Sequence, residues 1–182
     1  MNTFLKKLRT NNLHFKLVNN EHASFILKLR TDANYCKFLT KVESSLTKQL
    51  TWIKDYQRRS AKGLEYYFVI IDKNGEKVGL VRIYDINEKN FSWGSWILKT
   101  GSPNSYAIES AMLIYEIGFE FLKLQRSVFE VLKDNEAVIS FHLKTKAEIL
   151  RRDKEKVFFK FERSAYLNLK SRYKKFIPPT KV

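Results

Sequence analysis

The stretch WILKTGSPNSYAIESAMLIYE, residues 96–116, largely decides how the fold of this chain is interpreted. It begins as a strand, passes through a polar loop and continues as a strongly apolar segment with helical periodicity. The first amides of such a helix lack partners within the helix and lie at the positive end of its dipole. This arrangement can hold a phosphate group, although the same pattern also fits an ordinary connection capped by Asn104 or Ser105.

The sequence on either side predicts a mixed α/β fold. Upstream, apolar spacing predicts helices over 21–39 and 45–56, followed by three antiparallel strands over 66–72, 77–85 and 90–99, with a tight turn at Asn74-Gly75. Downstream we expect a helix over 105–122, a strand over 126–132, a helix over 135–144, strands over 147–151 and 157–161, and a basic helix over 164–176. This order predicts a mostly antiparallel sheet with helices on both faces.

Composition limits the class of protein. The chain has 182 residues, a hydrophobic fraction of 44% and a formal net charge of +15, so it can bury a core and is not expected to be disordered. Its single cysteine excludes an intrachain disulfide, and its three histidines lack the spacing of metal ligands. No apolar run approaches the ~20 residues of a membrane span. We predict a single cytoplasmic domain over residues 1–182, with no metal.

The positive charge is concentrated toward the end of the chain. Residues 149–182 carry eleven Lys or Arg against three acidic residues, and the region 164–182 is predicted to be a basic helical tail. Such a segment attracts polyanions, including nucleic acid, or simply forms a solvated helix face. A nucleic-acid-binding module without catalysis is therefore one interpretation, although the chain lacks any recognised nucleic-acid motif.

Residues 104–109 resemble part of an acyltransferase motif. In the GNAT family of acetyl-CoA-dependent N-acetyltransferases, a pyrophosphate loop of pattern R/Q-x-x-G-x-G/A follows the fourth strand and begins a long helix. We align it on Asn104-Ser105-Tyr106-Ala107-Ile108-Glu109, because AIESAML, residues 107–113, parallels the family's G-I-G-x-A-L-L. Asn104, Ala107 and Glu109 depart from the pattern. Since a carboxylate beside a pyrophosphate is unfavourable, Glu109 should point away, be offset by Lys99, or serve another role.

A second match follows the expected fifth strand. The segment NEAVISFHLKTKA, residues 135–147, resembles the family's N-x-x-A-I-x-x-Y-x-K-x-G-F. The resemblance places Asn135 against the pantetheine arm of CoA and puts His142 where the family commonly has a tyrosine that reprotonates the CoA thiolate. Lys146-Ala147 replaces the Gly-Phe pair. Residues 13–30 also resemble the family's opening strand and helix, so the resemblance covers about residues 13–162.

The resemblance implies a specific site for acetyl-CoA, the co-substrate. A bulge would splay the fourth and fifth strands, the pantetheine arm would lie in the fissure between them, and a backbone N–H around Ile97–Leu98 would stabilise the oxyanion. The cofactor-binding positions implied are Ile97, Leu98, Lys99, Asn104, Ser105, Tyr106, Ala107, Ile108, Asn135 and Phe141.

Catalytic roles require groups that move protons. An imidazole has an ordinary pKa near ~6.5, so His142 is predicted to be the general acid, unless it is simply a packed histidine. Asp85 and Glu130 are candidate bases acting through water, and each could equally be a structural carboxylate. Tyr84, Trp93 and Glu109 are the candidate acceptor-binding residues, and strand alternation is expected to place Trp93 and Trp96 on opposite faces.

The charge also bears on the acceptor. A basic protein without an acidic cluster is expected to repel polyamines and to attract anionic acceptors. We therefore predict acetyl transfer to the primary amine of a small anionic molecule, such as a nucleotide-linked amino sugar, by direct attack in a ternary complex. A protein N-terminus remains an alternative acceptor, and the protein is expected to be a monomer or a homodimer.

Overall fold

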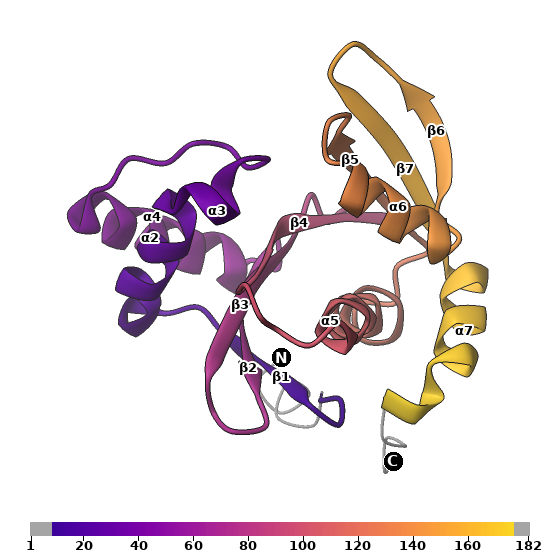
Figure 1. Ribbon diagram of the computed structural model, residues 1–182, viewed down its shortest axis with the longest axis horizontal. Coiled ribbons are helices and arrows are strands. Elements are labelled where there is room, and N and C mark those ends of the chain that lie inside the picture. The colour runs from indigo at the N-terminus through magenta and orange to yellow at the C-terminus, as the bar shows by residue number, and fades with distance from the viewer. Residues whose placement is uncertain (1–8, 177–182) are drawn as a thin grey trace.

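The computed structural model describes residues 9–176, which form one seven-stranded sheet with helices on both faces (Figure 1). The strand order is β1-β2-β3-β4-β5-β7-β6, and every neighbouring pair is antiparallel except β4 and β5. The strands are β1 (Leu13–Leu17), β2 (Tyr66–Asp72), β3 (Lys77–Tyr84), β4 (Asn90–Leu98), β5 (Arg126–Leu132), β6 (Glu148–Arg152) and β7 (Lys156–Glu162). The predicted α/β class and mostly antiparallel sheet are confirmed.

The helices follow the predicted order with two differences in detail. They are α2 (Ala23–Thr31), α3 (Ala33–Cys36), α4 (Leu46–Ala61), α5 (Ser105–Tyr115), α6 (Glu136–Lys144) and α7 (Arg163–Arg172), with 3-10 turns at Asn20–His22 and Lys174–Phe176. The helix expected over 21–39 is interrupted at Asp32, which adopts an extended conformation and caps α3 by accepting the N–H of Asn34. The helix expected over 105–122 continues beyond α5 as a π-helix over Glu116–Phe121.

Two hydrophobic cores lie on opposite faces of the sheet. Alternation along β2 sends Tyr67 and Val69 toward α2 and α4, while Phe68 and Ile70 face the core that includes α5. All seven residues of β2 are consequently buried, as expected for a strand covered on both faces. In Figure 1, α2, α3 and α4 lie on one side of β2–β4 and α5 lies on the other. The site described below lies where these two halves meet.

The basic tail is described as far as residue 176. The helix α7 packs through Tyr166 and Leu169, which are buried, and the Tyr166 hydroxyl donates to the Glu116 carboxylate at 2.7 Å. The predicted helix is thus confirmed for this part, and the stop expected at Pro178-Pro179 lies outside the described residues. No helix within residues 9–176 is long and apolar enough to cross a membrane.

Candidate active site

A wedge-shaped gap opens between β4 and β5. These parallel strands pair only at Asn90 with Arg126 and at Phe91 with Ser127. One residue further along, the hydroxyl of Ser92 donates to the Val128 carbonyl at 2.5 Å, and beyond this point the strands diverge. The gap therefore opens toward the C-terminal ends of both strands, and the predicted splaying is confirmed.

A β-bulge in β4 lies beside this gap. Gly94 pairs with Arg82 and Ile97 pairs with Leu80, so Ser95 and Trp96 together oppose one residue of β3. Ser95 has a φ of 48°, in the left-handed region that residues other than glycine seldom occupy. A bulge that bends one strand away from its neighbour explains why the pairing of β4 with β5 ends so early.

The bulge also corrects the expected positions of two tryptophans. Regular alternation predicts Trp93 and Trp96 on opposite faces, whereas the extra residue brings their rings together, with centroids 5.3 Å apart. Trp93 is buried and contacts Tyr115 and His142, so it presents little surface to an acceptor. Trp93 thus belongs to the core and also lines the pocket described next, and its role as a substrate-binding residue stays a prediction.

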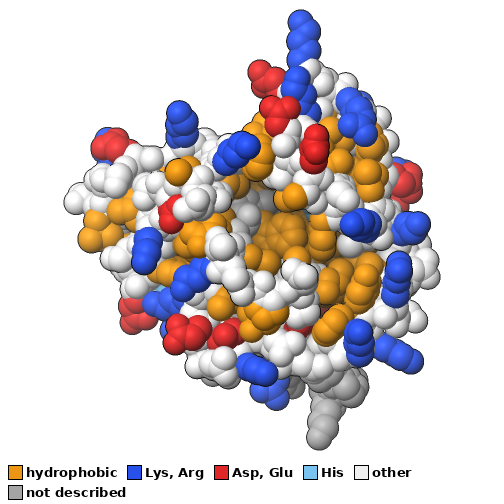
Figure 2. Space-filling model, viewed as in Figure 1, with side chains coloured by type: hydrophobic (Ala, Val, Ile, Leu, Met, Phe, Trp, Pro, Cys, Tyr) orange, Lys and Arg blue, Asp and Glu red, His pale blue; other side chains and the backbone are white. Residues whose placement is uncertain are grey.

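A pocket of about 610 Å³ spans the wedge and the part of the molecule formed by α2, α4 and the loop 38–42 between them. Figure 2 shows a hollow in this face of the molecule with hydrophobic side chains at its floor. Five of the predicted site residues line the pocket: Tyr84, Trp93, Glu130, Asn135 and His142. Asp85, Ile97, Leu98, Lys99, residues 104–109 and Phe141 are not part of its lining.

His142 lies at the inner wall of the pocket, enclosed by aromatic rings. Its ring centroid is 4.3 Å from that of Phe129 and 5.3 Å from that of Trp93, and its Nδ1 is buried without a partner among the described residues. Burial lowers the pKa of His142 to about 3, because the charged imidazolium loses its hydration. The expectation that both protonation states are available at neutral pH is therefore wrong: His142 is a neutral imidazole.

The two carboxylates predicted as bases differ in position. Glu130 lines the pocket with an exposed side chain and forms an ion pair with Lys156, and this hydrogen bond raises the pKa of Lys156. Asp85 is exposed in the turn after β3 with a φ of 50°, and it does not line the pocket. Asp85 therefore lies apart from the pocket that Glu130 lines, and its role as a base stays a prediction.

Glu109 is a structural residue. Its side chain is fully buried and accepts hydrogen bonds from the backbone N–H of Asn12 at 3.2 Å and from the Asn12 side chain at 2.8 Å. The carboxylate thus points toward the segment before β1 and away from the pocket. This agrees with the expectation that Glu109 points away from the pyrophosphate. Its assignment as a substrate-binding residue is corrected.

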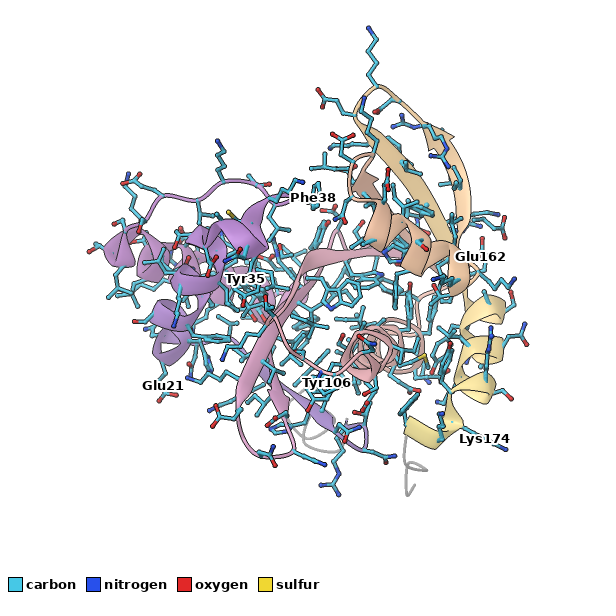
Figure 3. The ribbon with its side chains drawn as sticks, viewed as in Figure 1. Glu21, Tyr35, Phe38, Tyr106, Glu162 and Lys174 are labelled. Atoms are coloured by element: carbon cyan, nitrogen blue, oxygen red, sulfur yellow. The ribbon has the colours of Figure 1, made fainter. Side chains whose placement is uncertain are left out.

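The N-terminus of α5 follows directly from the open end of the wedge. Asn104 occupies the N-cap position without a side-chain capping bond, so the first amides of α5 keep their capacity to bind an anion. Tyr106 is buried in the core, which raises the pKa of its hydroxyl, and its backbone N–H donates to the Pro103 carbonyl at 2.9 Å, so the free amides of this turn are those of its neighbours. Figure 3 shows Tyr106 at the start of α5, and Tyr35 on the side of α3 that faces this loop.

Two backbone features fit the expected thioester site. The N–H of Lys99 donates to the Val78 carbonyl on β3 at 2.8 Å. Because successive amides of a strand point to opposite edges, the N–H of Leu98 faces the gap. The loop that follows is anchored from the helical side, where the Tyr35 hydroxyl accepts the N–H of Thr100 at 3.1 Å, which lowers the pKa of Tyr35.

Phe141 and Asn135 hold α6 beside the gap. The Phe141 ring packs on Trp96 with centroids 5.1 Å apart, and the Trp96 indole N–H donates to the Ser110 hydroxyl at 3.1 Å. Asn135 is the N-cap of α6, and its side chain accepts the N–H of Val138 at 3.4 Å. Phe141 thus connects α6 to β4 and, through Trp96, to α5, whereas Asn135 begins α6 and reaches the pocket.

The helical wall of the pocket was not predicted from the sequence. It includes Arg30, Phe38, Gln49 and Trp52, and Arg82 of β3 lines the pocket beside it. Two of these residues carry a recognisable sequence signal, because a polar residue interrupts an apolar helical stripe: Arg30 follows Ile26 by four residues, and Gln49 precedes Ile53 by four. No group of three or more His, Cys, Asp or Glu that could hold a metal occurs among residues 9–176.

Comparison with known proteins identifies the class. Residues 12–148 match the acetyltransferase (GNAT) domain family. The chain therefore belongs to the GNAT family of acetyltransferases and is an acyltransferase, and this family uses acetyl-CoA.

Solved structures agree with this assignment. FdhC, described as a nucleotide-linked sugar GNAT, is 38% identical with a TM-score of 0.87, and the match covers 94% of this chain and 98% of FdhC. Spermidine N-acetyltransferase from Vibrio cholerae, solved with CoA and spermine, is 18% identical with a TM-score of 0.74, covering 86% and 98%. Ribosomal-protein-S5-alanine acetyltransferase from Vibrio fischeri is 13% identical with a TM-score of 0.73, covering 85% and 94%. At these identities the last two show the fold alone. A search of curated protein sequences finds no match.

Proposed function

We propose that this protein transfers the acetyl group of acetyl-CoA to a primary amine of a small anionic acceptor, such as a nucleotide-linked amino sugar. The observation that carries the proposal is the wedge between β4 and β5, which opens toward the uncapped N-terminus of α5 and is continuous with a pocket walled by cationic side chains. Transfer would occur by direct attack in a ternary complex, since acetyl-CoA and acceptor could enter from the two sides of the wedge.

The residues of the wedge fit the chemistry of CoA. The free amides at the start of α5 would bind the pyrophosphate, and the N–H of Leu98 would donate to the thioester oxygen as it gains negative charge. Neither role is blocked, because the Glu109 carboxylate is turned toward Asn12. Ser105, Ala107 and Ile108 remain candidates for this pyrophosphate site through their backbone.

His142 would assist the departing thiolate as a neutral hydrogen-bond donor. Because its pKa is lowered to about 3, His142 is not an imidazolium at pH 7. The neutral imidazole still has one N–H that can donate a hydrogen bond. As the C–S bond breaks, this N–H would donate a hydrogen bond to the thiolate, and the proton lost by the attacking amine to water would in turn neutralise the thiolate. Replacing His142 with Phe should therefore lower kcat while leaving the Kd for CoA unchanged.

Glu130 is the remaining candidate for relaying a proton from the attacking amine. Among the pocket-lining residues it is the single carboxylate, and its exposed side chain can reach water. Its carboxylate is already engaged in the ion pair with Lys156 and lies on the exposed side of the pocket, where water can compete for the amine proton. We expect Glu130→Gln to lower kcat only a few-fold, with water accepting the proton in its place.

The acceptor proposal follows from the charges of the pocket wall. Arg30, Arg82 and Lys156 line it against Glu130 alone. Such a wall attracts anions and repels polyamines. FdhC, whose description names a nucleotide-linked sugar, supports the same class. A protein N-terminus remains the second acceptor considered, and a cytoplasmic location and a monomeric or homodimeric state remain predictions.

The test is to follow release of the CoA thiol with purified protein and a panel of amines. Uridine- and thymidine-diphosphate amino sugars should support turnover, whereas spermidine and an alanine-starting peptide should not. Turnover with spermidine alone would contradict the acceptor proposal and leave the acetyltransferase assignment intact. A protein that instead binds RNA tightly and ignores acetyl-CoA would support the nucleic-acid alternative.

A further inference from the structure

We infer that Arg30 and Gln49 form the anchor for the diphosphate of the acceptor, and that they set this enzyme's preference for anionic substrates. The inference rests on the proposed function, because it concerns the acceptor side of the same pocket. Arg30 belongs to α2 and Gln49 to α4, and both line the pocket on its helical wall.

Arg30 is a guanidinium whose described partners are all neutral. Its Nη2 donates to the Thr40 carbonyl at 2.7 Å, and its Nη1 lies 3.5 Å from the Ser95 hydroxyl. Its Nε is buried without a partner among residues 9–176. A partly buried cation with no opposing charge is unfavourable, so an anion that enters the pocket gains an interaction that the protein does not supply.

The other cations of the pocket lining are already compensated. Arg82 forms an ion pair with Glu65, a buried carboxylate that also pairs with Arg59. Lys156 pairs with Glu130 on the opposite rim. Within the described lining, Arg30 is therefore the cation left to bind a ligand, while Arg82 and Arg59 with one shared carboxylate add a net positive field nearby.

Gln49 provides a second polar group on the same wall. Its side chain is 9% exposed and lies on the buried stripe of α4 with Ile53 and Tyr56. Its backbone N–H bonds to Ser45, whereas its amide group makes no hydrogen bond within the described part of the chain. Because Gln49 lines the pocket and its amide is free of partners among the described residues, this amide can donate to a ligand oxygen or accept from a hydroxyl.

The position of Arg30 suggests which part of the acceptor it holds. Ser95, which Arg30 approaches, lies in the bulge where β4 leaves β5 and where the thioester is expected. In a nucleotide-linked amino sugar, the diphosphate and the amine are attached to the same sugar ring. If the diphosphate is bound by Arg30, the amine is therefore held close to the reaction centre. A diphosphate suits this site because the planar guanidinium binds phosphate oxygens through two parallel hydrogen bonds.

The test compares Arg30→Met with Arg58→Met. Arg58 is an exposed residue of α4 that pairs with Asp55 and does not line the pocket, so its replacement removes the same charge from the same part of the molecule. Kd values for UDP, dTDP and uridine are measured by calorimetry, with the Kd for CoA as the control for folding.

We expect Arg30→Met to weaken binding of UDP and dTDP at least about tenfold, with Arg30→Lys intermediate. Arg58→Met should leave binding near wild type, and uridine should bind weakly to all variants. Gln49→Leu should give a smaller loss than Arg30→Met.

The outcomes separate this inference from the proposed function. Equal UDP affinity of Arg30→Met and Arg58→Met, with nucleotide-linked amino sugars still acetylated at an unchanged KM, would overturn the anchor and leave the proposed function standing. If the wild type binds neither UDP nor dTDP and acetylates another class of amine, the proposed function itself fails. A loss of CoA binding in Arg30→Met would signal a folding defect, and the decision would then rest on Arg30→Lys, which keeps the charge.

Discussion

Replacing His142 with Phe should remove much of this protein's sensitivity to mild acid. The unfolded chain takes up a proton at this histidine near the ordinary pKa of 6.5, whereas the folded protein does so only near 3. Between these values the unfolded state binds more protons, so the free energy of unfolding falls as the pH decreases. At 1.36 kcal/mol for each pKa unit, the contribution lost between pH 7 and pH 5 is about 2 kcal/mol.

Phenylalanine is a suitable replacement because the site is already a cage of rings. Phe129, Phe141 and Phe159 surround His142, and the buried Nδ1 makes no hydrogen bond within residues 9–176 that the substitution would break. The assay is urea unfolding of both proteins at pH 7 and pH 5. The other titrating groups, including His14 and His22, are present in both proteins, so their contributions cancel in the comparison. Wild type should lose about 2 kcal/mol more than His142→Phe over this interval. An equal loss in the two proteins would refute a neutral, buried His142.

Three further substitutions separate the CoA site from the scaffold. Asn104→Asp places a carboxylate at the uncapped start of α5, where it should preserve the melting temperature but weaken CoA binding roughly fivefold or more in calorimetry, by repelling the pyrophosphate. Glu109→Gln should lower the free energy of unfolding by about 1–3 kcal/mol in urea, because a neutral amide cannot accept both Asn12 hydrogen bonds, and an altered KM for acetyl-CoA would contradict its structural role. Gly118→Ala should destabilise the protein by about 1–3 kcal/mol in the same assay, since the new Cβ would lie 2.2 Å from the buried Phe91 ring, and a neutral effect would show that this contact is not tight.

The regular elements of this fold could be predicted because their local signals agree. The β-branched and aromatic run of β2, the Asn74-Gly75 turn and the apolar repeat of α5 each specify one type of structure. The bulge at Ser95 could not be predicted in this way. Its positive φ occurs at a residue with no preference for that conformation, and the bulge reverses the facing of Trp96 that alternation predicts.

The candidate site was predictable in part, from the family motif for Asn135 and His142 and from strand ends for Tyr84, Trp93 and Glu130. Asn135, Glu130 and His142 lie at the pocket, as expected from positions near the end of β5 and in α6. Burial of His142, and with it the loss of its charged form, depends on rings from β4, β5 and β7 that are distant in sequence. The anchor residues Arg30 and Gln49 come from two helices whose packing brings them to one wall of the pocket. In the sequence, the one indication of a pocket position is that each residue interrupts an apolar helical stripe.

A crystal structure of the protein with CoA bound tests the main conclusion most directly. It should show the pantetheine arm lying between β4 and β5 beyond Ser92, with the pyrophosphate on the backbone amides at the start of α5. CoA bound elsewhere, with β4 and β5 unchanged and no ligand between them, would contradict the account.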